Sequence, residues 1–130
     1  MRTRILLVDD YPDALDVWAF YLRIRGYDVM TAADGMSAVS KAIDAHPDVI
    51  VMDLGLPGIS GIEATRRLKA NADTESIPII AATGNTLPSQ LNEAREAGLD
   101  RIVIKPCDPQ QLLNEIVAVT AAPKGWVSTC

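Results

Sequence analysis

Cysteine, histidine and aromatic residues are scarce in this 130-residue chain, which has two cysteines, one histidine and 5% aromatic residues. Cys107 and Cys130 show no metal-binding spacing, so neither a disulfide framework nor a zinc site is expected. Long hydrophobic runs are also missing. The apolar stretch near the N-terminus is short and ends in two acids, so we expect neither a signal peptide nor a membrane-spanning helix. The expected location is the reducing cytoplasm.

Basic residues are fewer than acidic residues, 12 against 17, and the formal net charge is −5 at pH 7. A direct nucleic-acid role is not expected, because phosphate binding requires a basic face. The length suits one compact domain, which we place at residues 1–121, followed at 122–130 by a tail or linker stub without helical or strand period. A chain of this size buries roughly two-thirds of its unfolded surface and needs no metal or disulfide to fold.

Short apolar runs alternate with longer segments of helical period. The runs, each expected to form a strand, are Ile5–Val8, Val29–Ala32, Val49–Met52, Ile79–Ala82 and Ile102–Ile104. Helices are expected from Pro12 to Gly26, over 35–46, from Gly61 through Leu68, from Pro88 to Gly98, and from Pro109 onward with Asp108 as N-cap. Strands that are apolar on both faces predict a parallel sheet covered by helices on both sides, which is a doubly wound α/β fold.

Charged and hydroxyl side chains stand at the ends of these expected strands. Asp9 and Asp10 end the first strand and Asp53 ends the third, while Thr83 and Lys105 end the fourth and fifth. In a doubly wound sheet, ligands bind at the carboxyl ends of the strands, where the winding direction switches. We therefore expect these five side chains to gather at one edge of the sheet.

Three carboxylates at one edge would repel one another. At an effective dielectric constant near 20, two unit charges about 4 Å apart cost roughly 4 kcal/mol, so a cation is expected between them. An all-oxygen site with few protein ligands suits Mg²⁺, and a lysine can meet a phosphate oxygen. A metal, an amine and a hydroxyl around one carboxylate predict a phosphoryl-transfer site with Asp53 as the nucleophile.

Four segments resemble the receiver domains of bacterial two-component response regulators, including those of chemotaxis. They are "ILLVDD", "VIVMDLGLPGISG", "IIAATGN" and "IVIKP", in this order, and the resemblance covers roughly residues 3 to 120. The resemblance implies a flavodoxin-like (βα)5 sandwich whose parallel strands have the order 2-1-3-4-5. It also implies a signalling switch, not an enzyme acting on other substrates.

The resemblance implies a role for each strand-end residue. Asp53 would accept a phosphoryl group, and Asp10, Asp53 and the Gly55 carbonyl would bind Mg²⁺, for which Mn²⁺ could substitute. Asp9 would act mostly through a metal-bound water. Lys105 would contact the phosphoryl group and precede a cis peptide bond to proline, and Thr83 would be the switch hydroxyl.

The partners implied are a sensor histidine kinase or a histidine phosphotransfer protein as donor, and a downstream protein or an output domain outside this chain as target. The sequence leaves open whether the chain is a monomer or a weak homodimer. It also leaves open a module of the same fold that binds its partner without phosphate. A dehalogenase-type phosphatase would need Asp-x-Asp at one strand end, and a flavin or nucleotide site would need a glycine-rich turn after the first strand; "VDDYPDA" contains neither.

Several positions depart from the family pattern or are assigned no part in the site. Ile102 stands where the family commonly has Tyr or Phe, so an aromatic swing is excluded and we expect a surface or half-buried aliphatic side chain. In the family, the residues at the positions of Gly55 and Asn85 flank the path of the water that hydrolyses the phosphoryl group. The two residues present here do not indicate how long that group would last. Ser60 receives no function, and His46 is expected to be a solvated helix cap.

The three aromatic residues near the start of the chain, Trp18, Phe20 and Tyr21, fall within four positions of one expected helix. They cannot all face the core, so one of them is a candidate for a partner surface. Trp126 in the tail is expected either to anchor the tail or to be unconstrained. Cys107 is expected to pack and not to serve redox chemistry.

Overall fold

The computed structural model describes residues 2–84 and 87–121. Within these ranges, the strands are β1 (Arg4–Val8), β2 (Asp28–Ala32), β3 (Val49–Met52), β4 (Ile79–Thr83) and β5 (Arg101–Ile104). The helices are α1 (Pro12–Ile24), α2 (Gly35–Ala45), α3 (Gly61–Ala70), α4 (Pro88–Glu96) and α5 (Pro109–Ala121). Every predicted element is present, with small shifts at its ends. Asn85, Trp126, Cys130 and the 122–130 tail lie outside the described residues, so the statements about them stay predictions.

The strands form one parallel sheet in the order β2-β1-β3-β4-β5. This order confirms the predicted doubly wound fold. The chain first winds from β1 to β2 and then crosses to β3 on the other side of β1, so the switch in direction lies between β1 and β3. The carboxyl ends of those two strands carry the acids singled out in the sequence.

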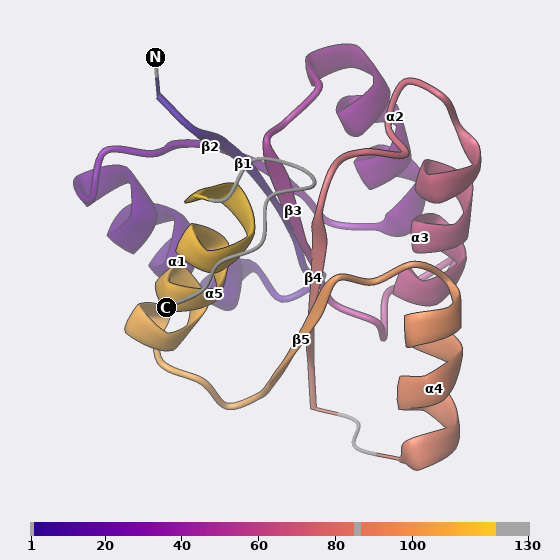
Figure 1. Ribbon diagram of the computed structural model, residues 1–130. Coiled ribbons are helices and arrows are strands. Elements are labelled where there is room, and N and C mark those ends of the chain that lie inside the picture. The colour runs from indigo at the N-terminus through magenta and orange to yellow at the C-terminus, as the bar shows by residue number, and fades with distance from the viewer. Residues whose placement is uncertain (1, 85–86, 122–130) are drawn as a thin grey trace.

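Helices cover both faces of the sheet, with α1 and α5 on one face and α2, α3 and α4 on the other (Figure 1). Alternate residues of β1 enter different cores, as expected for a strand whose side chains alternate between faces. Ile5 and Leu7 pack in the cluster that contains Trp18 and Leu112 of α1 and α5. Leu6, on the opposite face, packs in the cluster that contains residues of α2 and α3.

The edge strand β5 is more exposed than the inner strands. β1, β3 and β4 are buried along almost their whole length, but β5 has the burial pattern exposed, half-buried, buried, exposed. Ile104 is 43% exposed. β5 is thus less buried than the inner strands of the covered sheet, because an edge strand has only one neighbouring strand.

The helix ends follow local side-chain chemistry. The Asp34 carboxylate accepts the Ser37 N–H at 2.7 Å and so caps α2. Asp108 caps α5 as predicted, because its carboxylate accepts the Gln111 N–H at 2.9 Å. Gly26, just after α1, has a φ of 95°, which favours glycine.

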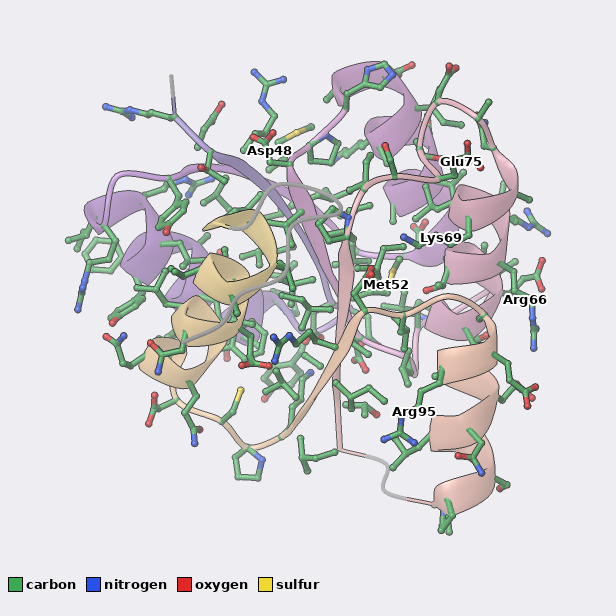
Figure 2. All side chains as sticks on the ribbon, in the orientation of Figure 1. Asp48, Met52, Arg66, Lys69, Glu75 and Arg95 are labelled. Atoms are coloured by element: carbon green, nitrogen blue, oxygen red, sulfur yellow. The ribbon has the colours of Figure 1, made fainter. Side chains whose placement is uncertain are left out.

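Lys69 ties α3 to the segments before β4 and β5. Figure 2 shows it pointing inward from α3, whereas Arg66 of the same helix points outward. The Lys69 ammonium donates to the Ile77 carbonyl at 2.8 Å and lies 3.4 Å from Asp100 Oδ2. Asp100 Oδ2 in turn accepts the N–H of Ile79 at 2.8 Å. These contacts are at the amino ends of the strands and leave the opposite edge free for the site.

Within the described ranges, every helix is too short or too polar to span a bilayer.

Candidate functional site

The acids after β1 and β3 lie side by side because the two strands pair in register. Val8 pairs with Met52, and the Asp53 N–H donates to the Val8 carbonyl at 2.9 Å. Asp9 and Asp53 are the residues that follow this pair. One carboxylate oxygen from each of Asp9, Asp10 and Asp53 lies within 4.8 Å of the other two. The strand order thus brings together acids that are far apart in the sequence.

Asp9 is the most enclosed of the three acids, with 3% of its surface exposed. Its Oδ1 accepts the Tyr11 N–H at 2.9 Å, and its Oδ2 accepts a hydrogen bond from the Lys105 ammonium at 2.6 Å. Both oxygens therefore have partners within the protein. Asp10, beside it, is exposed to solvent.

Asp53 is partly open, with 15% of its side chain exposed. The Gly55 N–H donates to Asp53 Oδ1 at 3.1 Å, and Asp53 Oδ2 lies 3.6 Å from the Lys105 ammonium nitrogen. One oxygen is thus oriented by the backbone, and the other faces a positive charge. This arrangement leaves the carboxylate accessible to a group arriving from solvent.

Lys105 follows β5, and its N–H donates to the Thr83 carbonyl at 2.8 Å. Burial alone would lower the pKa of its ammonium group, but the hydrogen bond to Asp9 and the charges of Asp53 and Asp9 together raise that pKa above its ordinary value. The side chain therefore carries its charge at neutral pH. The Lys105–Pro106 peptide bond is cis, as the resemblance implied.

Thr83 is the last residue of β4 and is 2% exposed. It shares with Asp53 the lining of a cavity of about 500 Å³. The cavity lies between the loop after β3, the start of α3 and α4, and its lining also includes Gly55 and Glu93. All five strand-end residues predicted from the sequence, and Gly55, are thus at the same edge of the sheet.

The loop after β3 depends on two residues to which the sequence assigned no part in the site. Ser60 Oγ accepts the Glu63 N–H at 3.1 Å and caps α3. The Ser-x-x-Glu pattern of a capping box was the signal that could have found it. At Gly61, a Cβ would lie 2.2 Å from the Asp53 carbonyl oxygen. The sequence marks that close approach only by a glycine at a helix start.

The aromatic residues of α1 separate as the helical spacing required. Trp18 is 9% exposed, whereas Phe20 is 67% exposed, and Tyr21 packs partly against the core. The ring centroid of Trp18 lies 5.9 Å from the Lys105 ammonium nitrogen. The helical pattern placed Trp18 among candidates for the core, but nothing in it indicated a neighbour from the end of β5.

Ile102, His46 and Cys107 have the surroundings expected from the sequence. Ile102 is half-buried and packs against the cluster that contains Ala81 and Ala94. His46 is exposed and is the C-cap of α2, with a φ of 49°. Cys107 is half-buried, and this burial raises the pKa of its thiol.

The donor set suits a hard cation. Among the described residues, one group of acids could hold a metal ion, and it is Asp9, Asp10 and Asp53. All the side-chain donors are carboxylate oxygens. Mg²⁺ prefers such oxygen ligands, whereas softer metals prefer nitrogen or sulfur ligands. Because the Lys105 ammonium already meets Asp9, it offsets part of the negative charge of this group.

Comparison with known proteins agrees with this geometry. The family model described as the response regulator receiver domain matches residues 5–117. Protein PilH of Pseudomonas aeruginosa is 36% identical over 118 residues, which cover 91% of this chain and 98% of that protein. The DNA-binding response regulator MtrA of Mycolicibacterium smegmatis is 35% identical over 118 residues. The match with MtrA covers 91% of this chain but 50% of MtrA, so the chain spans about half the length of that relative.

A solved structure shows the same likeness. It is the receiver domain of the sensor histidine kinase PA1611 from Pseudomonas aeruginosa, with a magnesium ion coordinated in its active site cleft. It matches with a TM-score of 0.87 and 34% identity, covering 94% of this chain and 100% of that one. The strand order, the acids at the switch point and these matches lead to one conclusion: the chain belongs to the response regulator receiver domain family.

Proposed function

We propose that the chain is a phosphorylation-controlled switch in which Asp53 accepts a phosphoryl group from a histidine kinase or a histidine phosphotransfer protein. The observation that carries this proposal is the meeting of Asp9, Asp10 and Asp53 with the Lys105 ammonium at one edge of the sheet. A partly open carboxylate held between a backbone N–H and an ammonium is suited to nucleophilic attack on phosphorus.

In the proposed reaction, an Asp53 oxygen attacks the phosphorus of a phosphohistidine. The new bond joins that oxygen to phosphorus, and the phosphorus–nitrogen bond breaks with its electron pair going to the departing imidazole. Lys105 neutralises part of the charge on the phosphoryl oxygens. Apart from its own phosphorylation and the hydrolysis of the product, no catalytic activity is proposed.

The residues present fit a magnesium ion. Asp10, Asp53 and the Gly55 carbonyl would hold it, with Asp9 acting mostly through a bound water, and Mn²⁺ could substitute. When bound, the ion supplies positive charge that offsets the carboxylates and the transferred phosphoryl group. Within the chain itself, the Gly55 N–H orients Asp53, and the Tyr11 N–H fixes Asp9.

Thr83 is proposed as the switch hydroxyl, donating to a phosphoryl oxygen once the group is in place. A hydrogen bond to a charged group contributes about 1.5–3 kcal/mol, whereas inverting a 1:99 equilibrium requires about 5.5 kcal/mol. Thr83 therefore shares the switching with Lys105 and with repacking of the loops. Ile102 has no aromatic ring to swing inward, so output is proposed to depend on loop and α4 movement.

The proposed receiver domain comprises residues 1–121, with 122–130 as a tail or linker stub. The signal would pass to a downstream protein or to an output domain outside this chain. The chain is proposed to act in the cytoplasm without direct contact with nucleic acid or membrane, as a monomer or weak homodimer.

The deciding experiment mixes the purified chain with acetyl phosphate and Mg²⁺ and measures its intact mass. The proposal expects one added phosphoryl group, which Asp53→Asn and removal of Mg²⁺ with a chelator both abolish. Beryllofluoride should give a matching Mg²⁺-dependent change in tryptophan fluorescence. A mass gain that survives Asp53→Asn would show that Asp53 is not the acceptor. Partner binding that needs neither phosphate nor Asp53 would favour the phosphate-independent module.

A further inference from the structure

The Lys105 ammonium has an aromatic neighbour in addition to its two carboxylate partners. Its ammonium nitrogen lies 2.6 Å from Asp9 Oδ2 and 3.6 Å from Asp53 Oδ2. The ring centroid of Trp18 is 5.9 Å from the same nitrogen. The ammonium is thus near two carboxylates and also over the face of an aromatic ring.

Trp18 is held firmly enough to act as a fixed surface. It is 9% exposed and belongs to the core cluster formed by α1, α5 and the sheet, together with Leu22, Leu112 and Ile116. Lys105, in contrast, has a flexible four-carbon stem that must be ordered before its charge can act at a defined place. A rigid partner beside this stem reduces the number of positions that the ammonium can occupy.

We propose that Trp18 is a positioning residue for the reaction, which holds the Lys105 ammonium within reach of Asp53 through the face of its indole ring. The inference rests on the proposed function, because it assigns Trp18 to the phosphoryl transfer at Asp53. The negative face of an indole attracts a cation within about 6 Å of the ring centroid. An attraction of the usual size changes an equilibrium by about two- to fivefold.

Shape and charge can be separated by fluorinating the indole. Fluorine withdraws electrons from the ring face and weakens its attraction for a cation, while the ring keeps nearly the same size. The experiment uses the full chain with Trp126→Phe, so that Trp18 is the one tryptophan left of two. Trp18 is then replaced by 5-fluoro-, 5,6-difluoro- and 5,6,7-trifluorotryptophan through biosynthetic incorporation.

The measured quantity is the initial rate of phosphorylation by acetyl phosphate with saturating Mg²⁺, together with the thermal midpoint of each protein. The rate should fall stepwise with each fluorine, by about two- to fivefold in total, at unchanged thermal midpoints. In a Lys105→Met background, the remaining rate should not depend on fluorination. Trp18→Phe should give a phosphorylation rate between those of the unfluorinated and the trifluorotryptophan proteins, because the face of a phenylalanine ring attracts a cation less strongly than that of an indole.

Several results would overturn the role of Trp18. One is a phosphorylation rate that is equal for all the fluorinated proteins or rises with fluorination. Another is a dependence on fluorination that persists in the Lys105→Met background, since the ring would then act on something else. A rate that follows the thermal midpoint and not the number of fluorines would indicate core packing alone.

A readout that needs no phosphoryl donor separates this inference from the proposed function. In the full chain, ring currents of Trp18 should shift the ε-methylene protons of Lys105 upfield, and Trp18→Leu should remove that shift. If the unfluorinated protein gains no phosphoryl group, the proposed function fails, and the positioning role fails with it even if the NMR contact is present. If that protein is phosphorylated but shows no dependence on fluorination, only the role of Trp18 is overturned.

Discussion

The Lys105 ammonium nitrogen lies closer to Asp9 Oδ2, at 2.6 Å, than to Asp53 Oδ2, at 3.6 Å. The lysine thus makes its stronger contact with the buried acid, which is 3% exposed, and a looser one with the proposed nucleophile. A charged hydrogen bond within the low-dielectric edge of the core anchors the side chain at Asp9. The Asp53 side chain is more exposed than that of Asp9 and so is more accessible to an incoming group.

Replacing Lys105 by methionine should affect metal binding and phosphorylation in opposite directions. Mg²⁺ should bind about three- to tenfold more tightly, or by about 0.6–1.4 kcal/mol, because a neighbouring positive charge is removed. Phosphorylation by acetyl phosphate should slow, because the phosphoryl charge loses its partner. Fluorescence-monitored Mg²⁺ titration and intact-mass kinetics measure the two effects. Lys69→Met, a substitution at the other end of the strands, is the matched control and should leave the Mg²⁺ affinity within twofold.

Thr83→Ala should separate acceptance of the phosphoryl group from the response to it. The mutant should gain mass from acetyl phosphate, because Asp53 and Lys105 are intact. The beryllofluoride-induced change in tryptophan fluorescence should be reduced, since a hydrogen bond contributing about 1.5–3 kcal/mol is lost. Thr83→Ser, which keeps the hydroxyl, should restore much of the change. A full response from the alanine variant would exclude Thr83 as the switch residue.

Gly61→Ala should destabilise the domain and disturb Asp53 together. An added Cβ would meet the Asp53 carbonyl oxygen at 2.2 Å and the Leu54 Cα at 2.8 Å. Both are backbone atoms that cannot rotate away, so we expect a loss of about 1–3 kcal/mol in the free energy of unfolding. Urea unfolding measures this loss, with Gly84→Ala as control because nothing lies within 4 Å of a Cβ there. Equal stabilities of the two variants would refute the contact.

Ser60→Ala should weaken the start of α3. The Ser60 hydroxyl oxygen accepts the Glu63 N–H at 3.1 Å, and loss of such a cap costs about 0.5–2 kcal/mol. Ser60→Asp should recover most of the stability, because an aspartate caps equally well and its charge favours a helix N-terminus. Urea unfolding of the three proteins gives the comparison. Were Ser60→Asp as unstable as Ser60→Ala, the capping role would be excluded.

Cys107 should react slowly with iodoacetamide at neutral pH. Burial, reinforced by the charge of Asp108, raises the pKa of its thiol, so the folded protein holds less of the reactive thiolate than a free cysteine does. In a Cys130→Ser background, the alkylation rate should rise with pH along a curve displaced to higher pH than that of the same protein unfolded in urea. Because the folded state binds this proton more tightly, the stability contribution of the thiol is lost as pH rises through its folded-state pKa. Coincident curves would refute the shift.

Much of the fold could be predicted because the pattern of apolar residues along short stretches of sequence determines where the strands form. The runs around Leu6, Ile50 and Ile80 are apolar at consecutive positions, which is what a strand buried on both faces requires. The edge strands could not be predicted in the same way. The apolar residues of β5 resemble those of β3, but Ile104 is 43% exposed because no further strand lies beyond β5.

The site, too, could be predicted in part from the sequence. By itself, the sequence determined which side chains end the strands, and therefore that Asp9, Asp10, Asp53, Thr83 and Lys105 share one edge of a parallel sheet. The distances among them come from contacts between residues far apart in the chain, such as the hydrogen bond from Lys105 to Asp9 across 96 positions. Only the tertiary structure decided that the lysine meets Asp9 more closely than Asp53, that an indole ring lies beside it, and that only a glycine fits at position 61. The physical reason is that residue order sets which groups reach the edge, whereas packing of the strands and of α1 sets their separation there.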